Sequence, residues 1–346
     1  MKFIRNIFIL LLLIIVVLES WYIVKNNNFF KNSSKKNIVT PKPLLAYTFD
    51  NLRKTKFPQT QITLGPVVSK NSDFISQIFY FSVPKKPNSK ILERVSGLMN
   101  IPLKPGNYPV IVMFRGFVPS NIYKPGIGTQ PVAAVLASHG YITLAPDFLG
   151  FGSSASSSAD SFEDRFQTYT TALTLLSSLP TLNSGLSPDY KGEVTADLSK
   201  IGIWGHSNGG HIALSTLAIS GVTFPTVLWA PVSVSFPYSI LYYTDESDDQ
   251  GMALRKALAK FETIYNTNLF SPPNYYKWIK APIEVNQGTN DVEVPIWWSN
   301  NLVLTLKKNG LDVKYYTYSN SDHNMLPDGW SKAVLNTLAF YNSFFK

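Results

Sequence analysis

The stretch KIGIWGHSNGGHIALSTLA, residues 200–218, constrains the fold of this chain more than any other part of the sequence. A short apolar segment ends at Trp204, the turn sequence GHSNG follows at 205–209, and a helical pattern begins at Gly210. This is the pattern of a nucleophile elbow, in which a strand turns sharply into a helix with a serine at the apex. The elbow strains the serine backbone and exposes its Oγ above the sheet. The sequence therefore predicts that Ser207 is a nucleophile.

Strand and helix patterns alternate on both sides of this turn. Strands are predicted at 77–83, 95–101, 108–114, 141–145, 201–204, 227–229, 282–285 and 313–318. Helices are predicted at 129–138, 162–176, 210–218, 252–261, 297–309 and 330–345. This alternation predicts an α/β fold with a mostly parallel, doubly wound sheet and helices on both faces. The pattern of residues 43–75 assigns no structure to them.

The alternation is interrupted at 231–280, a segment that contains prolines, aromatic residues and an acidic cluster at 245–249. An insertion at this place predicts a cap over the active site. Its aromatic side chains favour a partly apolar substrate; they are Phe236, Tyr238, Tyr242 and Tyr243. The acidic cluster is interpreted either as an exposed cap loop or as a site for a peptide amino terminus.

A serine hydroxyl needs a base to take its proton and a carboxylate to orient that base. In hydrolases built on such an elbow, the acid and the histidine follow the serine along the chain. The chain has four histidines, and two of them, His139 and His206, come before Ser207. His211 lies one helical turn after the serine and is expected to point into the helix packing. The candidate base is therefore His323, whose alternative interpretation is a histidine of a surface loop.

The carboxylate is expected in the loop after the strand at 281–285. Asp291 lies in this loop, in the sequence GTND, and is the predicted acid. Glu293 is the alternative acid, two residues further on. Asp322 is adjacent to His323 and cannot easily orient its neighbour's ring, so it is interpreted as a turn residue.

Two backbone amides are predicted to bind the oxyanion that develops during attack. One belongs to Asn208, which directly follows the nucleophile at the start of a helix. The other is expected in the loop after the strand that ends at Phe114, with the Phe117 amide as the candidate and Gly116 allowing close approach of the backbone. Arg115 is interpreted either as a buried structural residue or as a substrate contact.

The net charge of +9 is unevenly distributed along the 346 residues. Residues 1–42 carry seven lysines and arginines and one glutamate, so the remaining 304 residues carry a net charge of only +3. A folded part so close to charge balance argues against nucleic-acid binding. The chain has no cysteine and four histidines, which excludes disulfides and thiolate ligands and disfavours a multi-histidine site. We therefore expect neither a metal nor a cofactor.

The N-terminus has the composition of a membrane or export segment. An apolar run at 7–18 follows a short basic start, and residues 21–24 extend it. This layout predicts a signal peptide or membrane anchor at 1–24, a polar linker at 25–43 and one domain at 44–346. Four lysines soon after the apolar run favour a cytoplasmic domain, whereas the order of basic and apolar regions favours export. We expect a membrane-anchored or secreted chain whose catalytic domain is extracytoplasmic.

Several motifs together resemble the α/β-hydrolase superfamily, in its prolyl oligopeptidase and dienelactone hydrolase branch. They are PVIVMFRGF at 109–117, APDFLGFGS at 145–153, GHSNGG at 205–210, APIEVNQGTNDVEVP at 281–295 and SDHN at 321–324. The resemblance covers roughly residues 75–346 and implies Ser207 as nucleophile, Asp291 as acid and His323 as base. The chain departs from the family where His-Gly is frequent, with Arg115-Gly116 after one strand and Asn286-Gln287-Gly288 after another.

The residues and the resemblance together predict a serine hydrolase. Its substrate is expected to be a small-molecule ester or a peptide, cleaved through an acyl-enzyme. The alternative is a catalytically inactive hydrolase-fold protein that acts as a binding protein at the cell surface.

Overall fold

The computed structural model describes residues 14, 16–19, 21–22, 25 and 41–345, and it divides the chain into two compact units, Met1–Lys42 and Pro43–Lys346. In the first unit the described residues between 14 and 25 are helical, and Lys25 Nζ lies 4.8 Å from the centroid of the Trp21 ring. Most of the predicted segment 1–24 and linker 25–43 lies outside the described residues. Among the residues that are described, no helix combines the length and the apolar character needed to cross a bilayer.

The second unit is built on a nine-stranded sheet in the order β1-β2-β3-β5-β4-β6-β7-β8-β9. The strands are β1 (Thr63–Lys70), β2 (Phe74–Pro84), β3 (Leu92–Pro102), β4 (Gly106–Phe114), β5 (Ile142–Pro146), β6 (Val194–His206), β7 (Thr226–Trp229), β8 (Ile283–Gly288) and β9 (Val313–Tyr318). The six strands from β5 to β9 in this order are parallel, and β1, β2 and β3 extend the sheet with antiparallel pairing. The predicted mostly parallel sheet is therefore confirmed.

Helices cover both faces of this sheet. The longer ones are α3 (Gln130–Ser138), α4 (Ser161–Ser178), α5 (Leu182–Tyr190), α6 (Asn208–Ser220), α9 (Ile296–Lys308) and α10 (Trp330–Phe345). Residues of β4 alternate between two apolar cores: Val112 packs with α4 and α6, whereas Ile111 and Met113 pack with α3 and α10. This alternation follows from the pleat of a strand buried on both faces. The core thus fixes the register of β4 and β6, the two strands that carry the candidate site.

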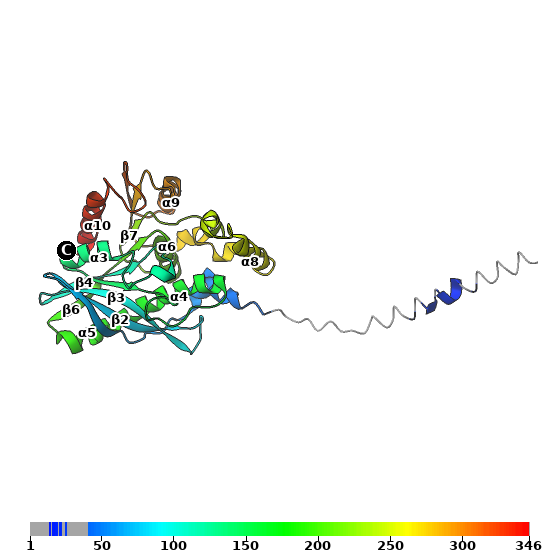
Figure 1. Cartoon of the computed structure of the whole chain (residues 1–346), viewed down its shortest axis with the longest axis horizontal. Helices are drawn as coiled ribbons and strands as arrows, with labels where there is room; N and C mark the ends of the chain where they lie inside the picture. Colours follow the sequence, from blue (N-terminus) through cyan, green and yellow to red (C-terminus); the bar gives the residue numbers. More distant parts are fainter. Residues whose placement is uncertain (1–13, 15, 20, 23–24, 26–40, 346) are drawn as a thin grey trace, which may run out of the picture. The chain divides into compact units, whose positions relative to one another are not determined.

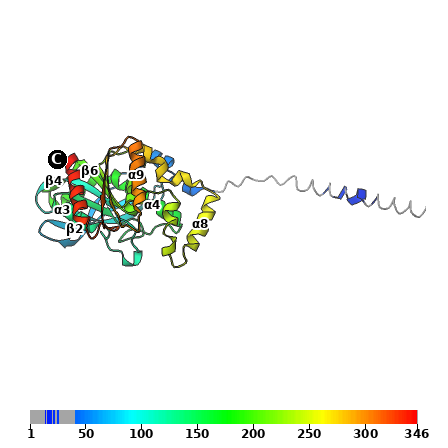
Figure 2. The ribbon, with the colours of Figure 1, turned by 90° about the horizontal axis from the view of Figure 1, so that it is seen from above.

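The segment between β7 and β8 contains short helices in place of strands. These are α7 (Tyr238–Leu241), α8 (Met252–Glu262) and the 3-10 helices η5 (Thr244–Glu246), η6 (Thr267–Phe270) and η7 (Pro272–Trp278). In the second unit, α8, in yellow, lies at the far end from α10, in red (Figure 1; Figure 2). Phe261 of α8 contacts Phe162 and Phe166 of α4, with ring centroids 4.8 and 6.4 Å apart, so this segment is packed against the main domain.

Residues 43–62, which the sequence leaves unassigned, pack on the same side as α4. They form the 3-10 helix η2 (Pro43–Tyr47) and the helix α2 (Phe49–Lys54). The buried ring of Phe49 is stacked on Tyr275 with a centroid distance of 4.6 Å, and the Tyr47 hydroxyl donates to Glu163 at 3.2 Å. These partners are more than 100 residues away along the chain, so no local sequence pattern predicts the contacts.

Candidate active site

The elbow has the geometry that its glycines predict. Ser207 adopts φ 56° and ψ −122°, a region that non-glycine residues rarely occupy, and α6 begins at the next residue. A Cβ at Gly205 would lie 2.6 Å from the Gly209 carbonyl oxygen, and a Cβ at Gly209 would overlap the carbonyl group of Phe114. The strained serine is held because its amide donates to the Trp229 carbonyl at 2.9 Å. Strand, turn and helix therefore approach closely enough to present Ser207 at the end of the sheet.

Asp291 and His323 are in direct contact. Asp291 Oδ2 lies 2.9 Å from His323 Nδ1, and the Asp291 side chain is fully buried whereas that of His323 remains partly exposed. The other oxygen, Oδ1, accepts hydrogen bonds from the amides of Glu293 at 3.0 Å and Val294 at 2.8 Å. These amides fix the carboxylate, and the contact leaves His323 Nε2 as the nitrogen that can face a substrate.

Gln287 supports this pair, and the sequence reasoning did not identify it as a site residue. Its Nε2 donates to Asp291 Oδ2 at 2.9 Å and to the Val294 carbonyl at 3.1 Å. The Ser299 hydroxyl donates to Gln287 Oε1 at 2.7 Å, which fixes the amide orientation. The feature of the sequence that could have identified Gln287 is its position in Asn286-Gln287-Gly288, where the chain departs from the family pattern.

The other histidines are held by structural contacts. His206 Nε2 lies 3.0 Å from the His323 carbonyl oxygen, with the two rings 4.6 Å apart, and burial together with His323 lowers the pKa of His206 to about 4. His206 is therefore neutral and donates to the loop that carries His323. His211 is buried in the helix packing with Nε2 2.7 Å from the Tyr169 hydroxyl, and His139 Nδ1 lies 2.7 Å from the carbonyl oxygen of Val135 in α3.

A cavity of about 630 Å³ brings the candidate residues together. Ser207, His323, Asn208 and Phe117 line it, and Asp291 lies behind His323. Its remaining walls come from the loop after β4, from α4, from the loop after β8 and from the cap. They include Gly116, Val118, Arg165, Ile240, Tyr243, Leu254 and the acidic residues Glu246 and Glu293.

The two alternative carboxylates are placed differently from Asp291. Glu293 is exposed at the cavity. Asp322 Oδ1 accepts hydrogen bonds from the amides of Asn324 at 2.8 Å and Leu326 at 2.9 Å, so it is a turn residue. Of the three acids considered, Asp291 is thus the one in contact with the His323 ring.

The loop that carries Phe117 is held by Arg115. The Arg115 guanidinium lies 4.1 Å from the Phe151 ring centroid and 4.7 Å from that of Tyr123, and it donates to the carbonyls of Gly116 and Asp147. These contacts assign a structural role to Arg115. Among residues 41–345, no carbonyl accepts a hydrogen bond from the amides of Phe117 or Asn208, so both amides are available to a ligand.

The cap contributes fewer aromatic side chains to the cavity than its sequence suggests. Of the four predicted aromatic residues, Tyr243 lines the cavity, whereas Phe236 is buried in the core against Phe166 and Phe261. The prediction was wrong for Phe236 because an irregular segment has no periodicity that tells inner from outer positions. In the described part of the chain, no cluster of three or more histidine, aspartate or glutamate residues could hold a metal ion.

A mostly parallel sheet with a serine elbow, and with an acid and a histidine on loops after later strands, defines the α/β-hydrolase fold. Comparison with known families agrees with this class. A model of the Prolyl oligopeptidase family matches residues 190–346, and a model described as Chlorophyllase matches residues 81–230.

Individual relatives include both peptidases and esterases. The chain is 26% identical over 245 residues to the "Uncharacterized peptidase YtmA" of Bacillus subtilis (strain 168), covering 68% of this chain and 83% of that protein. The acetyl xylan esterase from Paenibacillus sp. R4 has a TM-score of 0.58 at 17% identity, over 89% of this chain and 96% of that one. The Pyrococcus horikoshii acylaminoacyl peptidase has a TM-score of 0.53 at 17% identity, over 83% of this chain and 48% of that one, so this chain spans about half its length. These similarities support a serine hydrolase with the α/β-hydrolase fold, similar to the Prolyl oligopeptidase family over residues 190–346.

Proposed function

We propose that the protein hydrolyses ester or amide bonds with Ser207 as nucleophile, His323 as general base and Asp291 as the carboxylate that orients the base. The observation that carries the proposal is the 2.9 Å contact between Asp291 and His323 beside a cavity that Ser207 and His323 both line. The contact engages Nδ1, so Nε2 is left to take the serine proton.

The reaction then follows in two stages. Ser207 Oγ forms a bond to the substrate carbonyl carbon while its proton passes to His323, and the amides of Phe117 and Asn208 donate to the oxyanion. The proton next moves from His323 to the departing alcohol or amine, which leaves an acyl-enzyme. Water attacks the acyl group with the same base, and release of the acid restores Ser207.

The proposed substrates are small-molecule esters and peptides. Support comes from the relatives, which are named as an acetyl xylan esterase, an acylaminoacyl peptidase and a peptidase. Side-by-side assays of short-chain p-nitrophenyl esters and of aminoacyl p-nitroanilides with the full chain discriminate the two classes. A peptidase cleaves the anilides with the higher kcat/KM, whereas a carboxylesterase cleaves the esters.

A fluorophosphonate probe tests the nucleophile. We expect the full chain to be labelled and the Ser207→Ala variant to remain unlabelled. Ser199→Ala is the matched control because Ser199 is an exposed serine of β6 outside the cavity, and this variant should be labelled like the parent. Absence of labelling in folded parent protein would refute the proposal and favour the inactive binding protein instead.

We also propose that residues 1–24 hold the chain at a membrane or direct its export, on the strength of the apolar run and its basic start. Alkaline extraction of membranes and protease treatment of intact cells test this, with a chain lacking residues 1–24 as control. Recovery of the full chain in the cytosolic fraction would contradict it.

A further inference from the structure

Arg165 is an arginine of α4 for which the described residues supply no ion-pair partner. Its side chain lines the 630 Å³ cavity and also a second cavity of about 300 Å³ beside it. Its Nε and Nη2 atoms are buried and have no hydrogen-bond partner within residues 41–345. None of the ion pairs between described residues includes Arg165.

Such an arrangement is unfavourable in the free protein. Removing an ion from water costs several kcal/mol unless a counter-ion and hydrogen bonds compensate. Burial lowers the pKa of Arg165 below its ordinary value, with Tyr169 and Tyr243 acting in the opposite direction. The nearby His211 offers no negative charge, since burial and Arg165 hold its pKa well below its ordinary value. The buried nitrogens of this guanidinium lack hydrogen-bond acceptors, and a negatively charged ligand would supply them.

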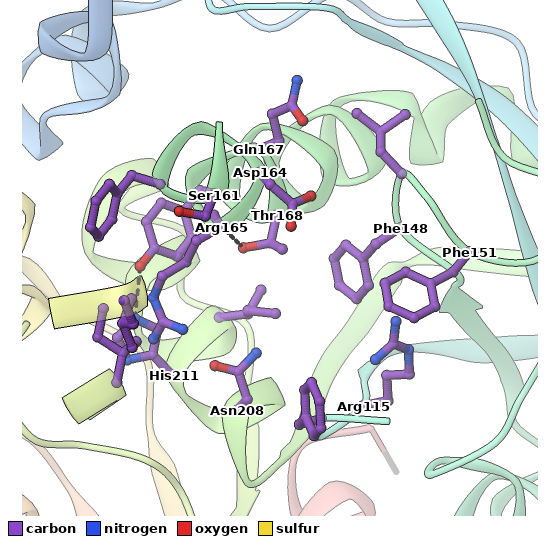
Figure 3. A pocket seen from close by; sticks show the side chains of 17 residues that line it. Arg115, Phe148, Phe151, Ser161, Asp164, Arg165, Gln167, Thr168, Asn208 and His211 are labelled. Atoms are coloured by element: carbon purple, nitrogen blue, oxygen red, sulfur yellow. Dashed lines mark hydrogen bonds between the residues drawn. The ribbon is translucent and has the colours of Figure 1, made fainter. Parts of the chain in front are cut away.

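The second cavity shows the contrast between two arginines. Figure 3 shows Arg115 with Phe148 and Phe151 on one side of this cavity, and Arg165 with His211 on the other. Arg115 is enclosed by aromatic rings and donates to two carbonyls, and only its buried Nε lacks a hydrogen-bond partner among the described residues. In Arg165, both Nε and Nη2 are buried without such a partner.

The acidic residues nearby do not neutralise Arg165. Asp164, the preceding residue, also lines the second cavity, but it points away from Arg165 in Figure 3. Glu246 and Glu293 line the larger cavity but are exposed to solvent. Both glutamates face solvent, whereas Nε and Nη2 of Arg165 are buried. An anionic group would therefore gain most in the second cavity, away from the two glutamates.

We propose that Arg165 binds a carboxylate group of the substrate in this second cavity. The proposal rests on the function proposed above, because the two cavities share the walls Phe117 and Asn208, whose amides are assigned to the oxyanion. A guanidinium presents a planar fork that matches both oxygens of a carboxylate. The apolar walls of Phe148, Phe162 and Ile212 suit the hydrocarbon between this carboxylate and the scissile carbonyl. The substrate class is thus an ester or amide that carries a free carboxylate.

Matched substrate pairs test the proposal on the full chain. Mono-p-nitrophenyl esters of straight-chain dicarboxylic acids are compared with p-nitrophenyl esters of monocarboxylic acids of equal length. A second pair, 4-acetoxybenzoate and its methyl ester, places the carboxylate on the leaving group instead. Arg165→Met should lower the carboxylate-to-neutral ratio of kcat/KM by about tenfold to a hundredfold for one of these arms, mainly through KM, as expected for loss of a charged hydrogen bond.

Two control variants separate binding from charge and folding. Arg165→Lys should retain part of the ratio, because it keeps the charge and loses the fork. Arg255→Met makes the same substitution on α8 at an exposed arginine outside both cavities, and it should leave the ratio unchanged. The Tm of Arg165→Met should equal or exceed that of the parent, since an unmatched buried charge has been removed. A lower Tm with equal losses on both members of every pair would overturn the proposal in favour of a structural role.

A binding measurement makes the result independent of turnover. The monomethyl ester of octanedioic acid is titrated calorimetrically into the Ser207→Ala chain and into the same chain with Arg165→Met. A drop in affinity of about tenfold or more supports the carboxylate site, even if the parent failed to react with the fluorophosphonate and the catalytic proposal fell. Equal affinity, or no binding to either chain, together with an unchanged substrate ratio would overturn the site.

Discussion

Replacing Asp291 by asparagine tests the proposed catalytic carboxylate most directly. The change keeps the size of the side chain but removes the charge that faces His323 Nδ1 at 2.9 Å. This charge matters in the transition state, when the imidazole becomes an imidazolium. At an effective dielectric constant of about 20, Coulomb's law gives about 6 kcal/mol for unit charges at this distance, and about 4 kcal/mol at 4 Å. Since 1.36 kcal/mol corresponds to a factor of ten, kcat should fall by about 10³ to 10⁴.

The assay is steady-state hydrolysis of p-nitrophenyl acetate, with KM expected to change little because Asp291 does not line the cavity. Glu293→Gln is the matched control, as it removes one carboxylate from an exposed position two residues away, and its kcat should stay within about threefold of the parent. Circular dichroism establishes that both variants are folded. The reasoning is refuted if the Asp291→Asn variant retains more than about a tenth of the parent kcat, or if Glu293→Gln is equally impaired.

Three further predictions concern the packing of the site and a buried acid. Gly209→Ala should lower the free energy of unfolding by about 1–3 kcal/mol or more, because its Cβ would overlap the Phe114 carbonyl; urea unfolding equal to that of the parent contradicts this. Gln287→Met should lower kcat by about tenfold or more at unchanged KM, since Asp291 loses a hydrogen bond worth about 1.5–3 kcal/mol; a change confined to KM argues against a positioning role. Burial raises the pKa of Glu284 from 4.5 to about 7, so the folded state retains a proton that the unfolded chain releases, and stability falls as the pH rises through this window. Glu284→Gln should therefore stabilise the protein by up to about 3 kcal/mol above pH 7 and flatten the dependence of urea unfolding on pH; an unaltered dependence refutes the assignment.

The sequence was sufficient for features that depend on local order. The elbow could be predicted because glycines at 205 and 209 are required by contacts between residues close in the chain. Asp291 and His323 could be selected because each follows a strand of the parallel sheet, and parallel strands bring their carboxyl ends to one edge. The structure places these two side chains in contact.

Features that depend on distant contacts were not predictable. Residues 43–62 have no periodicity of their own and are fixed by partners such as Tyr275 and Glu163. Likewise, nothing in the sequence separates Arg115, enclosed by aromatic rings, from Arg165, whose buried Nε and Nη2 have no hydrogen-bond partner in the described chain. β6 begins at Val194, seven residues before the predicted strand, because polar residues there still pair with the neighbouring β4.

Residues 43–54 also fix part of the cap. Phe49 stacks on Tyr275, and the Leu44 amide donates to the Tyr265 hydroxyl at 3.3 Å. These contacts attach the C-terminal half of the cap to the main domain. The stretch 245–250, in contrast, is exposed along its whole length. The C-terminal half of the cap is therefore fixed by a segment that precedes the sheet in the chain, whereas the part of the cap that borders the cavity at Glu246 and Ser247 faces solvent.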